Sequence, residues 1–429
     1  MKALLLGMAA LIAAPAAAET IAFVGGTVAI GDGSAPIEGG TVVVRDGRIV
    51  AAGRGVAVPA GARTVDASGK WVSAGLVAGF TRMGIVEVDL GVSSADDRSA
   101  GKSPFNAAID IVPAINPRAG PIQTNRAEGI TRAIVAPVSE GAIFGGQGAV
   151  IDLGADMDAV TRPRAFQFVE LGDEGAQQGG GSRAAAYVYL KNAIAEARNP
   201  ASAGAGGFEP LLKRADADAL RPVASGQMPL LVHVERASDI LQVLTLKRDF
   251  PGLKLVLVGA TEGWTVAPQI AAAGVPVIAT ALADLPSSFE QLAATQSNIG
   301  RMKAAGVKVS MGMINDDEAR QARLEKQYAG NLVALTKVPG ASGLDWGAAF
   351  ATLTSGPAAA LGLDGEIGSL RPGRRADVVV WDGDPLELAT AATMVLIDGV
   401  EQPMTNRQTK LRDRYRVPQE GALPKAYER

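Results

Sequence analysis

The chemistry open to this chain is limited by its single histidine and by its lack of cysteine. Without cysteine there are no disulfide bonds, thiolate metal sites, iron–sulfur clusters or cysteine nucleophiles. The one histidine, His233, excludes any site that needs two imidazoles. Glu235 follows His233 by two residues, so on a β-strand both side chains point to the same face and could act together as acid and base.

Composition and charge exclude further classes of protein. The 429 residues are 48% hydrophobic, which is enough apolar material for a large core. Lysine and arginine total 41 against 44 aspartates and glutamates, so the net charge of −3 gives no cationic field that would attract nucleic acid. We therefore expect no nucleic-acid partner.

The first 18 residues predict export. Lys2 is followed by an apolar run at 3–14 and by the small residues Ala16, Ala17 and Ala18, which is the layout of a cleavable secretory signal peptide. A buried N-terminal helix is the alternative. No later segment offers the roughly 18 consecutive apolar residues of a membrane span. We expect an exported, periplasmic protein that is cleaved near Ala18 and has no membrane span.

The middle of the chain alternates short β-branched runs with alanine-rich helical patterns. The runs expected to be strands are residues 76–88, 129–137, 166–171, 229–235, 253–259, 275–280 and 307–313. The helical patterns are residues 182–198, 237–250, 265–273 and 289–305. This alternation is typical of a parallel sheet with crossover helices and favours a (β/α)8 barrel.

The two ends of the chain are both rich in β-forming residues, which predicts that they pair into a second, smaller sheet. Asp46-Gly47 separates two such runs near the N-terminus and is a hairpin signal. A similar block begins at Ile367. The barrel would then be an insertion within this smaller sheet.

Characteristic segments follow one another over nearly the whole mature chain. They are RDGRIVAAG, VDASGKWVSAGLVAGFTRMG, GITRAIVAPVSEGAIFGGQGAVIDL, VHVERASDILQVL, LKLVLVGATEG, AAGVPVIA and TSGPAAALGLDGEIGSLRPGRRADVVVWDGDPLE. In these segments the sequence resembles the amidohydrolase superfamily, particularly its exported imidazolonepropionase-like or prolidase-like branch. The resemblance implies an α/β fold, a TIM-like (β/α)8 barrel with a composite β-sandwich. It also implies a hydrolase of non-peptide carbon–nitrogen bonds, in which divalent metal such as zinc activates water at the barrel mouth.

Under this resemblance the chain divides into five parts. They are a signal peptide (1–18), a first β-sandwich segment (19–74), the barrel (75–356), a second β-sandwich segment (357–401) and a polar C-terminal tail (402–429). Within the barrel, the resemblance places a turn near the mouth at the glycine-rich run 145–148.

Most metal-ligand positions of the resembling family are changed in this chain. Phe80 and Arg82 stand where the first barrel strand of the family ends in two histidines. Phenylalanine cannot coordinate a metal, and arginine brings a fixed cation to the place of the metal charge. His233 does match a ligand, whereas Glu235 and Gly259 stand at two further histidine positions.

The last barrel strand also departs from the family. Ile314 stands at the position of an aspartate that serves as ligand and base, and Asn315 or Asp316 could replace it only if the register shifts. An oxygen-only Mg²⁺ or Ca²⁺ site would need Glu235, Asp239 or Asp316, and nothing in their spacing supports one. We therefore expect no bound metal and no cofactor.

Two functions remain open. The first is a pseudoenzyme, either a partner subunit of an active amidohydrolase paralogue or a binder of a small amide or dipeptide-like ligand. In it, Arg82 and Glu235 are expected to form a salt bridge that fills the vacated metal pocket. The alternative is an active hydrolase with a rebuilt, metal-independent site in which His233, Glu235 and Arg82 are catalytic. The residues expected to line the ligand pocket are Phe80, Gly259, Ile314 and Asp316. A homo-oligomer or a hetero-oligomer with such a paralogue would fit either function.

Overall fold

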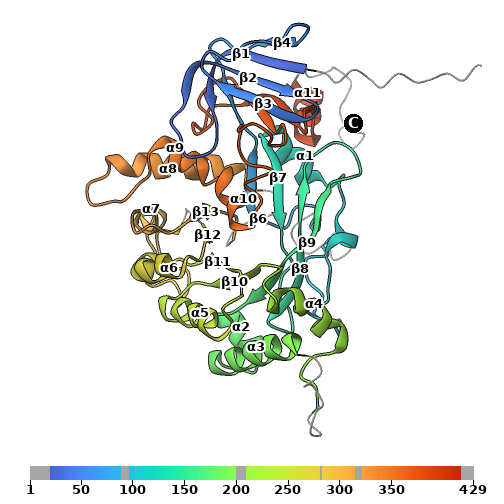
Figure 1. The fold of residues 1–429 in the computed structure, drawn as a ribbon, viewed down its shortest axis with the longest axis vertical. Coiled ribbons are helices and arrows are strands. Elements are labelled where there is room, and N and C mark those ends of the chain that lie inside the picture. Colours follow the sequence, from blue (N-terminus) through green and yellow to red (C-terminus); the bar gives the residue numbers. More distant parts are fainter. Residues whose placement is uncertain (1–19, 88–95, 200–208, 281–282, 315–320, 417–429) are drawn as a thin grey trace, which may run out of the picture.

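The computed structural model describes residues 20–87, 96–199, 209–280, 283–314 and 321–416. Two eight-stranded sheets organise these residues (Figure 1). Sheet A is built from both ends of the chain, and sheet B is formed by the segment between them. The predicted signal peptide, 1–18, lies outside the described residues. Among the residues described, no helix is both long and apolar enough to cross a bilayer.

Sheet A joins the two ends of the chain as the sequence predicts. Its central pairing is antiparallel between β5 and β14, with Ala74 opposite Val378. The Asp46-Gly47 hairpin is confirmed, because both residues have positive φ, 54° and 68°, and connect β2 to β3. The strands of this sheet are β1 (Thr20–Ala29), β2 (Ile37–Arg45), β3 (Arg48–Gly53), β4 (Arg63–Asp66), β5 (Trp71–Ala74), β14 (Val378–Trp381), β15 (Ala392–Ile397) and β16 (Val400–Glu401).

Sheet B is a nearly closed barrel, which confirms the predicted TIM-like fold. The strands are β6 (Leu76–Thr81), β7 (Ile130–Val135), β8 (Phe144–Asp152), β9 (Val160–Glu170), β10 (Leu230–Val234), β11 (Leu255–Gly259), β12 (Val277–Ala279) and β13 (Val309–Met311). At the seam between β13 and β6, the backbone N–H of Met313 donates to the carbonyl of Phe80 at 3.1 Å.

One strand of the barrel differs from the expectation. β8 runs antiparallel to both of its neighbours, and it contains the glycine-rich run that the sequence placed in a turn. Gly148 is needed in this strand because a Cβ there would lie 2.1 Å from the ring of Phe166. The glycines therefore make room for aromatic rings on β9, and the prediction of a turn at 145–148 is wrong.

Helices cover the outside of the barrel, and α3, α5, α6 and α7 follow one another along one side of it (Figure 1). The predicted helices at 182–198 and 237–250 match α3 and α5, whereas only the end of 289–305 is helical. The helices are α1 (Gly120–Ala127), α2 (Asp173–Gln178), α3 (Arg183–Arg198), α4 (Arg214–Ala224), α5 (Ala237–Asp249), α6 (Ala267–Ala273), α7 (Asn298–Ala304), α8 (Glu325–Ala334), α9 (Trp346–Ala351), α10 (Ser355–Ala360) and α11 (Arg407–Arg416).

The inside of the barrel is filled by side chains. Its lower end, which is the end where the parallel strands begin, is closed by α10 and the residues after it. Leu363 and Ile367 belong to the same buried cluster as Phe166 and Leu231. The sequence assigned these two residues to the second β-sandwich segment, whereas their packing belongs to the barrel. The reason is that their apolar side chains cover the open ends of the strands.

Candidate ligand site at the barrel mouth

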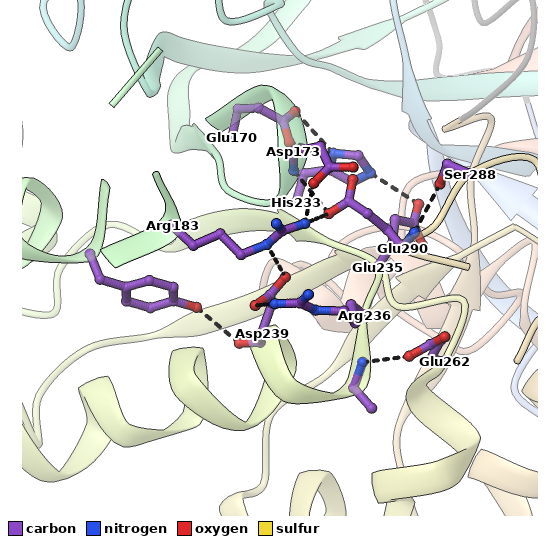
Figure 2. Close-up of polar contacts among 12 residues, drawn as sticks. Glu170, Asp173, Arg183, His233, Glu235, Arg236, Asp239, Glu262, Ser288 and Glu290 are labelled. Atoms are coloured by element: carbon purple, nitrogen blue, oxygen red, sulfur yellow. Dashed lines mark hydrogen bonds and ion pairs between the residues drawn. The ribbon is translucent and has the colours of Figure 1, made fainter. Parts of the chain in front are cut away.

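His233 lies between two carboxylates at the end of β10 (Figure 2). Its Nδ1 is 2.8 Å from Oε1 of Glu170, and its Nε2 is 3.1 Å from Oε1 of Glu235. The three side chains are 20%, 11% and 5% exposed, respectively. The C-terminal ends of barrel strands are where functional groups gather in this fold, so this cluster marks the candidate site.

Strand register brings these residues together. β9 and β10 run parallel with Glu170 directly beside His233, and Glu235 follows the last residue of β10. The backbone N–H of Thr261 donates to Oε2 of Glu235 at 2.8 Å. Gly259 ends β11 with φ +86°, and a Cβ on it would lie 2.6 Å from Oε1 of Glu235. Gly259, which stands at a lost histidine position under the resemblance, therefore leaves the space that the carboxylate of Glu235 occupies. Gly259 and the N–H of Thr261 together form the cradle of Glu235.

The two carboxylates hold the imidazole in its charged form. Burial lowers the pKa of His233, but Glu170 and Glu235 outweigh it and bring this pKa well above its usual range. Burial raises the pKa of Glu170, and the neighbouring His233 opposes that rise. A buried cation persists where it is paired and hydrogen-bonded, so His233 is an imidazolium at neutral pH.

Arg82 lies just after β6 in an aromatic part of the barrel. Its guanidinium carbon is 4.6 Å from the ring centroid of Phe80 and 5.9 Å from that of Phe168, distances at which a cation is attracted to an aromatic face. Phe80 and Ile314 belong to the same buried cluster. Glu235 forms an ion pair with His233, which the sequence did not predict. The salt bridge expected between Arg82 and Glu235 stays a prediction.

A second set of charges lies around the His233 cluster (Figure 2). Arg183 on α3 contacts Asp239 and Glu290 at 2.9 Å each, and it also pairs with Asp173. A Cβ on Gly172 would lie 2.6 Å from Oε2 of Glu290, which places Glu290 at the end of β9. Through Glu290, the loop that follows β12 therefore contacts α3 and the residues just after β9.

The described residues do not fit the divalent metal that the resemblance implies. His233 has both ring nitrogens in contact with carboxylates, and Phe80 offers no ligand atom. Within the described ranges, no group of three or more His, Asp or Glu residues could hold a metal ion. Asn315 and Asp316 lie outside those ranges. The cation that the structure shows between Glu170 and Glu235 is the imidazolium of His233.

Glu170 is the residue of this cluster that sequence reasoning missed. It is the last but one residue of the run 166–171, which is mostly apolar, and no spacing in the sequence connects it to His233. A signal was present, because the carboxyl ends of neighbouring parallel strands meet at one edge. A charged residue near the end of a predicted barrel strand is therefore a candidate site residue, even without a spacing that connects it to His233.

This chain is similar in sequence to known amidohydrolases and similar in fold to solved structures. A sequence model described as Amidohydrolase family matches residues 265–401. The amidohydrolase tasK of Hapsidospora irregularis is 45% identical over 60 residues, which are 14% of this chain and 6% of that protein. The imidazolonepropionase of Maricaulis maris is 30% identical over 156 residues, or 36% of each chain. These alignments thus span only a minor part of the curated relatives.

A solved structure matches over a much larger extent. An amidohydrolase from Thermotoga maritima superposes with a TM-score of 0.77 and 25% sequence identity. The superposition covers 89% of this chain and 99% of that one. Sheet A and the barrel are therefore both part of the shared architecture.

Proposed function

This chain belongs to the amidohydrolase superfamily, and on that premise we propose that it is a non-catalytic member that binds a small amide or dipeptide-like ligand at the barrel mouth. By resemblance its relatives hydrolyse carbon–nitrogen bonds. This chain would retain the barrel as a binding site and would lack the metal-dependent chemistry of those relatives.

The observation that carries this proposal is the clamp on His233. An imidazole that contacts a carboxylate through each ring nitrogen has no free nitrogen for a metal or for a substrate proton. Its raised pKa also makes it a weak general base at neutral pH. A fixed imidazolium can still support ligand binding, because it neutralises part of the charge of Glu170 and Glu235.

The ligand class is proposed from the groups around the mouth. Amides and dipeptides offer both carbonyl oxygens and N–H groups, which can pair with the cationic and carboxylate side chains of this region. The guanidinium of Arg82 is suited to a ligand carboxylate, since its planar fork matches that group. Phe80, Gly259 and Ile314 would line the pocket, and Asp316, which lies outside the described residues, stays a predicted lining residue.

Export is part of the proposal and rests on the N-terminal sequence. Residues 1–18 would be removed, and the mature protein would act in the periplasm. A partner role is compatible with this location, because an inactive copy can associate with an active exported paralogue. Co-purification from the periplasm tests that role, and a protein that associates only with itself would contradict it.

The proposal is tested by measuring metal content and turnover on the same preparation. We expect protein purified without chelator to contain no stoichiometric zinc, iron or manganese, and to hydrolyse no member of an amide and dipeptide panel. The same panel should contain ligands that raise the Tm, and the Arg82→Met variant should lose that shift. Stoichiometric metal together with turnover would overturn the proposal.

A rebuilt hydrolase is the second candidate, and the line of contacts from Glu170 through His233 to Glu235 favours it. Such a line could relay a proton if a ligand displaced one carboxylate. It predicts metal-independent turnover that is lost in His233→Ala and retained in a Lys70→Ala control. Turnover that survives in His233→Ala would exclude this candidate.

A further inference from the structure

The face of the barrel opposite to the His233 cluster contains two adjoining cavities. One has a volume of about 480 Å³ and the other about 640 Å³. Both are lined by Pro276, Ala359 and Ala360, so they meet beside the segment that closes the lower end of the barrel. The walls of the two cavities include residues that directly precede barrel strands. Lys308 precedes β13, and Lys254 precedes β11.

Basic side chains predominate in these walls. The larger cavity is lined by Arg162, Arg164, Lys247 and Lys254, and no acidic residue lines it. The smaller one is lined by four basic residues, including Lys303 and Lys308, against Asp32 and Asp364. This excess is local, because the whole chain carries a net charge of −3. Concave surfaces lined by one sign of charge concentrate the electrostatic field and attract counter-charged ligands.

Part of this positive charge is already compensated and part is not. Arg371 pairs with Asp32 at 2.9 Å, and Arg162 pairs with Glu366 at 3.4 Å. Lys254 and Lys308, by contrast, form no ion pair with any residue that the structure describes. The same holds for Lys303 within the described ranges. Lysines without protein partners on the wall of a cavity are available to a ligand.

We propose that these joined cavities form a binding site for a small polyanion that carries two or more phosphate groups. Lysine ammonium groups bind phosphate oxygens as point charges, and several of them around one hollow favour ligands with several charges. The hydroxyls of Ser355 and Ser369 line the smaller cavity and add hydrogen-bond donors. The site is separate from the barrel mouth and does not depend on what binds there.

Calorimetry with inorganic tripolyphosphate tests the proposal on the full mature chain. We expect binding that weakens as salt is added, and an affinity at least about tenfold lower in Lys254→Glu/Lys308→Glu. The matched control is Lys70→Glu/Lys337→Glu, which changes the net charge equally at exposed lysines outside the cavities and should alter the affinity less than about twofold.

Three results would overturn the proposal. They are no binding of tripolyphosphate to the unchanged protein, an equal loss in both double variants, and citrate binding as tight as tripolyphosphate binding. Sedimentation with vesicles that contain anionic phospholipid distinguishes the source of the phosphate. Co-sedimentation that tripolyphosphate reverses supports a lipid headgroup at this site, and calorimetric binding without co-sedimentation supports a free phosphorylated ligand.

Discussion

Two cations in this protein are each held between carboxylates, yet they differ in burial, location and chemistry. Arg132 on β7 is fully buried between the barrel and the β-sandwich, where it contacts Asp377 and Asp398 at 2.8 Å. A third carboxylate, Asp152, is 3.6 Å away. His233 lies at the barrel mouth and retains 20% of its side-chain exposure between Glu170 and Glu235.

The comparison separates a permanent structural charge from an adjustable one. A guanidinium does not lose its proton in proteins, and its planar fork contacts Asp377 through two nitrogens. Arg132 therefore fixes the barrel to the sandwich under all ordinary conditions. An imidazolium can lose its proton, so the charge at the mouth responds to pH and to any ligand that changes its surroundings.

The largest effect is expected from removing the buried arginine. Arg132→Met leaves the buried carboxylate of Asp377 without its cation, whereas the partly exposed Asp398 keeps its pair with Arg375. We expect the free energy of unfolding to fall by about 3–5 kcal/mol. Urea denaturation measures this loss. The control is Arg63→Met, because Arg63 forms an exposed pair with Glu401 and should contribute less than about 1 kcal/mol. Equal losses in the two variants would contradict the role of Arg132.

A smaller loss is expected at the mouth. His233→Gln keeps hydrogen-bonding capacity but removes the positive charge, and the partly exposed site can admit water beside Glu170 and Glu235. We expect the free energy of unfolding to fall by about 2–3 kcal/mol, measured in the same urea series. A variant as stable as the unchanged protein would show that the imidazolium is not needed to balance the carboxylates.

The cradle of Glu235 should be sensitive to one methyl group. Gly259→Ala adds a Cβ 2.6 Å from Oε1 of Glu235 at a residue with φ +86°, so we expect a loss of about 2 kcal/mol. Gly274→Ala is the control, because Gly274 has φ +63° and open space around the position of a Cβ, which leaves about 1 kcal/mol of backbone strain. Thermal unfolding of both variants separates the contact from the strain, and a Gly274→Ala loss equal to that of Gly259→Ala would contradict the contact.

The smallest effect is the part of the pH dependence of stability that comes from the mouth. The raised pKa of His233 gives stability that is fully present below the unfolded value of about 6.5 and is lost as pH rises through the folded value. The raised pKa of Glu170 acts in the same direction, with loss beginning above about 4.5. Unfolding measured from pH 5 to pH 9.5 should show this decline.

His233→Gln provides the control for that decline. We expect its alkaline loss of stability to be reduced, whereas Arg63→Met should keep the profile of the unchanged protein. A His233→Gln profile that declines as steeply as that of the unchanged protein would assign the alkaline loss to other groups.

The sequence predicted those features that rest on local signals. The Asp46-Gly47 turn and the helices at 182–198 and 237–250 follow from turn chemistry and periodicity, which act over a few residues. β8 was missed because its glycines resemble a turn. Their actual role, which is to make space for Phe166, depends on a neighbouring strand and cannot be seen locally.

The candidate site was predicted only in part for the same reason. His233 and Glu235 are neighbours in the sequence, and the structure brings them into contact. Glu170 is brought to His233 by the pairing of β9 with β10, and Gly259 by that of β10 with β11. The alignment of neighbouring strands depends on the packing of the whole barrel. The residues that will lie beside a strand-end residue therefore cannot be predicted from the sequence close to it.

The pairing of Ala74 with Val378 also sets the order in which the protein can be made. The N-terminal strands of sheet A leave the ribosome long before β14, β15 and β16 exist. Until then β5 has an open edge, which is a hazard for aggregation. Contacts this distant in sequence form slowly. The pairing of β5 with β14 can therefore form only after the barrel segment, which lies between the two halves of sheet A in the sequence, has been synthesised.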